Sequence, residues 1–417
     1  MRSPGCTLRC CPGAVSRVRA PTRTSRSLVT ITPAKSISVT SYSMSRSPRR
    51  HARLTNKQRP KQSSKIIHVL GLGPAGRLFA YRAQQRGFQV HGWDPTGGST
   101  PSTMGCWREQ LPDWFPPELI SSCTRPWLIN SQGRRRQLNR EYVMLSPKLR
   151  NFGAFPTTRT ATCPSELSAA DTLIIDTRPP QHPLPVRQVA SGIILPEDAL
   201  PPQERFAVLM DFRPIPGPTP TFHYRIPLGD GTWLLEETIL AIPEPLPIDL
   251  HQQLTDMLHT RLQRLGIDSA KAIATDQVNF PLGPTHIPTD PPGTLSFGAR
   301  GGYLHPATGY SIGMSLAAID RTLDATPQNV HLKLLHFLRR CGLDVLLSLN
   351  PTPFRVFFDT FFDLPERHIF GYLHGNVAAT TASMLRFITK LAAQPRNRIK
   401  REILYTTLSL GAYSPCT

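Results

Sequence analysis

The sequence predicts an α/β fold with three parts: a parallel sheet flanked by helices, an inserted β-rich part and a helical C-terminal region. Three observations predict it. From residue 66 onward a strand, a glycine-rich turn, a helix and a second strand follow one another within about 30 residues, the length of one βαβ unit. Between residues 206 and 238 three short apolar segments follow one another with turn residues between them. Residues 330–373 are strongly apolar and aromatic.

The first part begins with the apolar strand 66–70, which runs directly into Gly71-x-Gly73-x-x-Gly76 and a helix that Gly87 ends. In this pattern the first glycine makes the tight turn, the second lets a pyrophosphate approach the backbone, and the third lets the helix pack closely. The helix N-terminus attracts phosphates. Asp94 closes the second strand, where a carboxylate accepts bonds from a ribose hydroxyl. We therefore predict a Rossmann-like, dinucleotide-binding domain; the alternative is a glycine-rich turn in an unrelated α/β protein.

The dinucleotide is predicted from two further features. The N-terminal position of the motif, its Pro74-Ala75 pair and the long insertion that follows resemble FAD-binding monooxygenase-type folds, which carry a second flavin-contacting segment late in the chain. The small residues at 297–311 fit that segment, and Ser311 begins a helix. The predicted cofactor-binding residues are Gly71, Gly73, Pro74, Ala75, Gly76, Asp94, Gly298, Pro306, Thr308 and Gly309.

The remaining elements divide the chain. We expect strands at 206–212, 221–227 and 231–238, then a helix that Asp249 caps and Gly266 ends. Residues 66–180 with 290–325 are predicted to form the Rossmann-like FAD/NAD(P)-binding domain, residues 181–289 a β-rich substrate domain, and residues 326–417 a helical, aromatic-rich C-terminal region.

The net charge of +20 is concentrated in an N-terminal arm. Residues 1–65 hold 15 of the 48 Lys and Arg residues and no acid, so the excess does not describe a basic face of the folded body. No nucleic-acid-binding module is present, and we predict no nucleic-acid partner. The arm suits a disordered segment, an organellar transit peptide or an over-long start with Met44 nearer the true beginning.

The 8 Cys lack disulfide or zinc spacing, which favours a reducing compartment and no metal. No apolar stretch reaches the ~18 residues of a spanning helix.

Several short motifs resemble those of one family. His305-Pro306-Ala307-Thr308-Gly309-Tyr310 resembles the HPxTGY signature of lycopene cyclases of the plant, cyanobacterial and bacterial soluble-fold type, and Leu234-Leu235-Glu236-Glu237-Thr238 is similar to their FLEET element. Further similar segments lie at 105–107, 188–193, 210–213 and 222–227. All occur in the family's order across roughly residues 66–390.

The resemblance implies a lycopene cyclase that acts on lycopene or a related linear carotene. A proton is delivered to the terminal double bond, the internal double bond closes a six-membered (β-type) ring on the resulting cation, and a proton is lost without net redox change. The resemblance implies reduced FAD as cofactor and NAD(P)H as its reductant. Other carotenoid-pathway enzymes are expected as possible partners.

The residue chemistry agrees with that mechanism. Protonation of an alkene requires a positioned acid, and a cation in an apolar cavity requires an anion nearby. Apolar neighbours raise the pKa of a carboxyl group by desolvation. Glu236 and Glu237 point to opposite faces of a strand, so only one can face a cavity. The family match gives the acid role to Glu236, with Glu237 second; a solvated strand edge is the alternative for the pair.

Other sites keep two interpretations. His305 is either part of the site or a structural cap, and Asp211 with Arg213 is either part of the site or a structural ion pair. The aromatic residues 354–362 fit a core, or a membrane-surface face helped by nearby cations. The basic residues in question are Lys333, Arg339, Arg340 and Arg355.

We expect membrane association without a transmembrane helix, at the cytoplasmic face in a bacterium or in a plastid if the arm is a transit peptide. Two other functions remain: an FAD-dependent monooxygenase or oxidoreductase acting on another lipophile, and a carotenoid- or flavin-binding relative without turnover. One departure bears on the choice, since Asp176-Thr177-Arg178-Pro179-Pro180 replaces the Asp-Ala-Thr-Gly-like turn of many flavoproteins.

Overall fold

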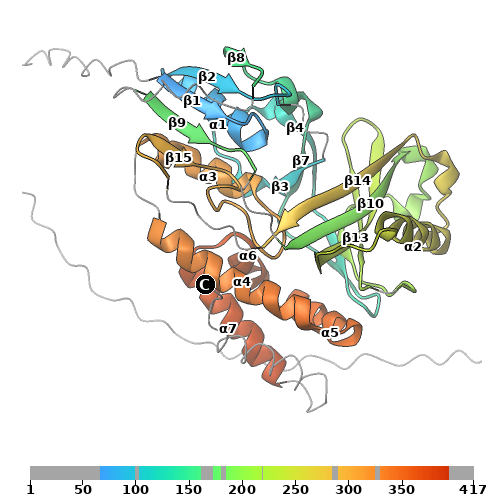
Figure 1. Ribbon diagram of the computed structural model, residues 1–417. Coiled ribbons are helices and arrows are strands. Elements are labelled where there is room, and N and C mark those ends of the chain that lie inside the picture. The colour runs from blue at the N-terminus through green and yellow to red at the C-terminus, as the bar shows by residue number, and fades with distance from the viewer. Residues whose placement is uncertain are drawn as a thin grey trace, which may run out of the picture. The chain divides into compact units, whose positions relative to one another are not determined.

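A parallel sheet carries the predicted βαβ unit (Figure 1). The computed structural model describes residues 66–98, 103–160, 172–179, 185–217, 219–283, 290–324 and 329–393, so the predicted arm at 1–65 lies outside the described residues. The strand order is β15-β9-β1-β2-β8, and every pair is parallel. The strands are β1 (Ile66–Leu70), β2 (Gln89–Trp93), β8 (Thr157–Thr158), β9 (Thr172–Asp176) and β15 (Thr294–Ser296).

Two helices pack together beside this sheet. Helix α1 (Pro74–Gln85) begins inside the glycine-rich motif, because proline suits the first helical turn. Helix α3 (Ile312–Leu323) starts after Ser311 as predicted. Phe79 of α1 and Phe297 before α3 meet edge to face with ring centroids 4.9 Å apart, and both are buried. This contact fastens the late segment to the first βαβ unit.

The second sheet has seven strands in the order β14-β10-β13-β12-β11-β5-β6 and is antiparallel except between β11 and β5. Its strands are β5 (Trp127–Ile129), β6 (Arg135–Gln137), β10 (Val186–Pro196), β11 (Val208–Asp211), β12 (Phe222–Pro227), β13 (Thr232–Pro243) and β14 (Ala274–Leu282). Helix α2 (Leu250–Leu265) packs on β10 and β13 and ends at Gly266, whose φ of 68° is left-handed. Asp249 precedes α2 as predicted, but its side chain makes no capping bond.

The remaining elements are a small sheet and a group of helices. The sheet has the order β3-β7-β4, with β3 (Gly105–Trp107), β4 (Ile120–Thr124) and β7 (Tyr142–Leu145). The helices are α4 (Asn329–Ser348), α5 (Pro351–Phe362), α6 (Glu366–His374) and α7 (Val377–Ala393), and α7 contacts the other three. Within the described ranges, no helix is both long and apolar enough to span a membrane.

Candidate functional site

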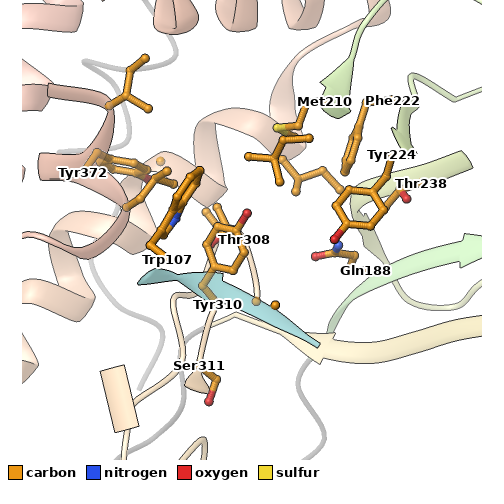
Figure 2. A pocket seen from close by; sticks show the side chains of 18 of the residues that line it. Trp107, Gln188, Met210, Phe222, Tyr224, Thr238, Thr308, Tyr310, Ser311 and Tyr372 are labelled. Carbon is orange, nitrogen blue, oxygen red and sulfur yellow. The ribbon is translucent and has the colours of Figure 1, made fainter. Parts of the chain in front are cut away.

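A large apolar cavity lies where the two main sheets and the C-terminal helices meet (Figure 2). It has a volume of about 620 Å³. Its lining includes the glycine-rich turn and residues 307–312, together with residues of β12 and β13 and phenylalanines of α5. Four of the aromatic residues at 354–362 line the cavity, namely Phe357, Phe358, Phe361 and Phe362, whereas Phe354 is buried outside the lining.

One face of the seven-stranded sheet supplies a wall of the cavity. Side chains alternate along β13, so Glu236, Thr238 and Leu240 line the cavity. Tyr224 lies directly opposite Glu236 on β12, and Phe222 lies opposite Thr238. Figure 2 shows Tyr224, Thr238 and Phe222 grouped together on the strands. The predicted alternation therefore places one glutamate of the pair in the cavity.

Glu236 carries the sole ionisable carboxyl group among the described residues that line the cavity, and no Lys, Arg or His side chain lines it. It is 8 % exposed, and its Oε1 atom has no hydrogen-bond partner among the described residues. Burial raises the pKa of Glu236 to about 8, and the charge of Asp276 adds to that rise. An acid of this kind keeps its proton near neutral pH and can deliver it to a bound molecule.

Three tyrosines, Tyr142, Tyr224 and Tyr310, line the cavity together with Glu236. Tyr224 lies opposite Glu236 on β12, and its hydroxyl donates toward the Met144 sulfur at 3.4 Å. Burial raises the pKa of each phenol, that of Tyr310 to about 12, so the phenols stay neutral. Tyr310 and Tyr224 belong to two recognised motifs, but Tyr142 was not singled out by the sequence because its neighbours form no motif.

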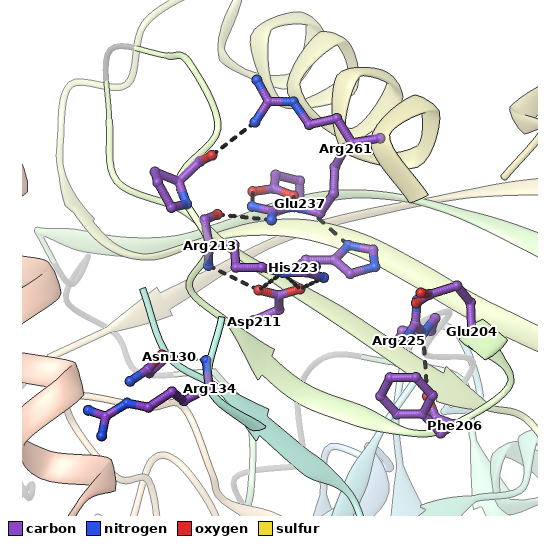
Figure 3. Close-up of polar contacts among 12 residues, drawn as sticks. Asn130, Arg134, Glu204, Phe206, Asp211, Arg213, His223, Arg225, Glu237 and Arg261 are labelled. Atoms are coloured by element: carbon purple, nitrogen blue, oxygen red, sulfur yellow. Dashed lines mark hydrogen bonds and ion pairs between the residues drawn. The ribbon is translucent and has the colours of Figure 1, made fainter. Parts of the chain in front are cut away.

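Glu237 points to the opposite face of the sheet, under α2 (Figure 3). Arg261 of α2 donates Nε to its Oε2 atom at 2.7 Å and Nη2 to its Oε1 atom at 2.8 Å. The Thr221 hydroxyl also donates to Oε1. Glu237 is fully buried, and it is bonded within the fold away from the cavity.

The Asp211 and Arg213 side chains form an ion pair on this second face, and neither lines the cavity. His223 lies between Asp211 and Glu237 in the strand register, which completes a buried polar row. Of the two interpretations open from the sequence, the geometry favours the structural ion pair.

The glycine-rich turn is arranged as its spacing predicts. Gly71 has a φ of +84° and donates its N–H to the Trp93 carbonyl, and a side chain at Gly76 would lie 2.1 Å from the Gly71 carbonyl oxygen. A side chain at Gly73 would meet no atom within 4 Å. Gly73, Pro74, Ala75 and Gly76 all line the cavity. The space beside Gly73 is open, as binding of a pyrophosphate would require, and that binding stays a prediction.

Asp94 fastens the second strand to this turn. One carboxylate oxygen accepts the Leu72 N–H at 2.8 Å, and the other accepts the Thr96 N–H at 2.8 Å and the Gly98 N–H at 3.1 Å. Its predicted contact with a ribose stays a prediction.

The late segment reaches the cavity through Thr308 and Gly309, whereas Gly298 and Pro306 lie outside the lining. Gly298 instead lets the segment pass α1, since a side chain there would lie 3.1 Å from Ala75 Cβ. His305 is fully buried, and its Nδ1 accepts the Ala307 N–H at 3.2 Å. Burial lowers the pKa of His305, so a neutral imidazole shapes this turn as the structural-cap interpretation expects.

Thr177 lies in the segment that differs from the usual flavoprotein turn. Its hydroxyl donates toward the Gly71 carbonyl at 2.7 Å, and its side chain lines the cavity. Asp176 pairs with Arg178 and Arg300. The segment that replaces the usual turn is thus still bonded to the glycine-rich turn.

Comparison with known proteins adds three findings. Residues 134–400 match the family model described as lycopene cyclase protein. The chain is 28% identical over 371 residues to the chloroplastic lycopene beta cyclase of an Oncidium hybrid cultivar, covering 74% of this chain and 77% of that protein. It is 25% identical over 395 residues to the lycopene beta cyclase of Synechococcus elongatus, covering 80% and 94%.

Among solved structures, the fold is similar to that of a geranylgeranyl bacteriochlorophyll reductase-like protein from Thermoplasma acidophilum. The TM-score is 0.55 at 11% identity, covering 82% of this chain and 98% of the other. This likeness supports the predicted α/β fold with its inserted sheet and helical C-terminal region.

Proposed function

Because the chain belongs to the lycopene cyclase family, we propose that it converts the ends of lycopene, or of a related linear carotene, into β-type ionone rings. The observation that carries the proposal is Glu236. It is a buried carboxyl group with a pKa of about 8, and it faces an apolar cavity in which no other described side chain carries a charge.

The proposed reaction uses that placement. The Glu236 carboxyl transfers its proton to the terminal double bond, so an O–H bond breaks, a C–H bond forms and a tertiary carbocation results. The internal double bond attacks the cation and closes the ring. Loss of a ring proton to a base, for which the Glu236 carboxylate is available, restores neutrality. No electrons are exchanged, and the apolar walls keep water from trapping the cation.

Aromatic side chains in the cavity would also stabilise the carbocation through the faces of their rings. Tyr224 lies opposite Glu236, and the neutral phenol rings of Tyr142 and Tyr310 line the same cavity. The faces of aromatic rings attract cations, by about 0.5–2 kcal/mol each when water is excluded. These rings therefore stabilise positive charge that the single carboxylate does not reach.

The residues of the glycine-rich turn fit FAD. The open space at Gly73 would take the pyrophosphate, and Thr308, whose buried Oγ1 atom has no partner among the described residues, would meet the flavin end together with Gly309. When bound and reduced by NAD(P)H, FAD would supply an electron-rich, anionic ring system that stabilises positive charge. The chain's own contribution is to hold that group beside the cavity and to exclude water.

A membrane surface is the proposed source of the substrate, since a long linear carotene is insoluble in water. Phe337 of α4 lines the cavity and is 60% exposed, so it marks an opening. Leu334 of α4 and Leu385 of α7 are also exposed, and Lys333 and Arg340 are exposed on α4. Apolar side chains with basic neighbours suit a surface that lies on anionic lipid.

The test uses purified protein, reduced FAD and lycopene in liposomes. We expect a cyclic product without net consumption of NADPH. We also expect Glu236→Gln to lower turnover at least 100-fold while FAD stays bound, because Gln cannot donate the proton. Oxygen-dependent NADPH oxidation with an oxygenated product would instead support the monooxygenase alternative.

A further inference from the structure

A second carboxyl group shares a row of the sheet with Glu236. Gly192 of β10 pairs with Glu236 of β13 on one side and with Asp276 of the edge strand β14 on the other. Directly opposed residues of antiparallel strands project from the same face. The side chains of Asp276 and Glu236 therefore stand on the cavity face of the sheet, two strands apart.

The residue between them has no side chain. A Cβ atom at Gly192 would lie 2.6 Å from the Glu236 Cγ atom, closer than real contacts allow. The Glu236 side chain thus leans over Gly192, in the direction of β14. Any larger residue at 192 would both displace the acid and separate the two carboxyl groups.

Asp276 is held in place from the other side. The Thr103 hydroxyl donates to its Oδ2 atom at 3.0 Å, and Thr103 itself lines the cavity. Asp276 is partly exposed, whereas Glu236 is 8 % exposed. One carboxyl group of the pair therefore keeps contact with water while the other is buried.

We propose that Asp276 is a positioning residue for the acid: its negative charge, held across Gly192, keeps the proton on Glu236 until the substrate takes it. The inference rests on the proposed function of Glu236. The groups that face Glu236 are Asp276 from β14 and the Tyr224 phenol from β12, with Tyr142 and Tyr310 beyond it. No cation among the described lining residues offsets the charge of Asp276.

Infrared titration of the protonated Glu236 carboxyl tests the proposal on the purified full chain without requiring turnover. The band is assigned by its loss in Glu236→Gln. In Asp276→Asn the repulsion is removed, so we expect deprotonation of Glu236 to move down by about one pH unit. Asp276→Glu keeps the charge and should titrate near wild type.

The matched control is Asp256→Asn, which removes an exposed carboxylate from α2 on the other side of the sheet and should leave the titration unchanged. Thr103→Val removes the hydroxyl donor and should move the titration in the same direction as Asp276→Asn, by less. It also serves if Asp276→Asn does not fold. Titrations of wild type, Asp276→Asn and Thr103→Val that coincide would overturn the proposal.

The proposed acid role of Glu236 and the proposed positioning role of Asp276 are tested by different outcomes. If Glu236→Gln still cyclises lycopene, the proposed acid is wrong, whatever the infrared titration gives. If cyclisation depends on Glu236 but the titration of Glu236 is unchanged in Asp276→Asn, only the positioning role of Asp276 is wrong. In wild type we also expect cyclisation to decline at high pH, with the decline beginning at lower pH in Asp276→Asn.

Discussion

Two neighbouring glutamates on one strand have opposite surroundings. Glu236 faces an apolar cavity with an unpaired oxygen atom, and Glu237 lies in a buried pair with Arg261. The sequence predicts this division, because side chains alternate along a strand. It cannot predict the partners: Arg261 lies 24 residues further on, and only the packing of α2 on β13 brings it to Glu237.

The pKa of Glu236 makes stability depend on pH in a defined direction. Burial raises it from 4.5 to about 8, so between these values the folded protein binds a proton that the unfolded chain has released. The free energy of unfolding therefore falls as pH rises from about 4.5 to 8. The variant Glu236→Gln has no titratable group at this position, so its stability lacks this pH dependence. We expect it to be more stable than wild type above pH 8, by about 1 kcal/mol or more, with the difference shrinking toward pH 5.

Thermal or urea unfolding of both proteins across that pH range measures this effect. A constant difference between the two proteins at all pH values would contradict it.

We expect Glu237→Gln to lower stability while changing turnover little. It leaves the Arg261 guanidinium buried against a neutral partner, which costs about 3 kcal/mol. We expect a lower midpoint in urea unfolding, and turnover per folded molecule within about threefold of wild type because the proton donor is untouched. A loss of turnover as large as that of Glu236→Gln, in protein that is still folded, would mean that Glu237 is the acid.

At the scale of elements, local patterns decide what the sequence can predict. The succession β1, α1 and β2 follows from adjacent residues, as does the end of α2 at Gly266. The strands β10 and β14 were not predicted, although 188–193 was recognised as a motif, because their pairing with β13 is set by contacts far apart in sequence. Asp276 was missed for the same reason: only the register shows which residue faces it.

The glycine-rich turn allows a matched pair of substitutions. Gly73 has extended backbone and empty space around a future Cβ atom, whereas a Cβ atom at Gly76 would collide with the Gly71 carbonyl. We expect Gly73→Ala to keep the wild-type melting temperature but to weaken FAD binding at least tenfold, since the methyl group fills the open space. Gly76→Ala should lose both stability and FAD. Flavin fluorescence and calorimetry check this; unchanged FAD affinity in Gly73→Ala would place the pyrophosphate elsewhere.

At the scale of the whole molecule, the cavity joins parts that are distant in the chain. Its lining runs from Gly73 to Ile388, so no single segment contains the site. That is why the sequence points to Glu236 and to the glycine-rich turn but does not identify the residues of the cavity walls. The aromatic residues 354–362 resembled a core by composition, and the folded chain turns several of them toward the cavity.

The exposed apolar residues of α4 and α7 give a prediction at this scale. Leu385 is 59 % exposed and does not line the cavity. We expect Leu385→Glu to reduce binding to anionic liposomes at least threefold and to slow cyclisation of liposomal lycopene, while cyclisation in detergent and the melting temperature stay near wild type. Unaltered sedimentation with liposomes would indicate another contact surface; Asp256→Asn is again a control far from the opening.

The Arg261–Glu237 pair has a consequence beyond stability. A slip of β13 by one residue would turn every side chain to the other face. Glu237 would then face the cavity and Glu236 would lie under α2. The two glutamates would exchange surroundings without any change in the sequence. Such a slip would also carry Glu237 out of its double hydrogen bond with Arg261. The ion pair thus favours the observed strand register, in which Glu236, the proposed acid, faces the cavity.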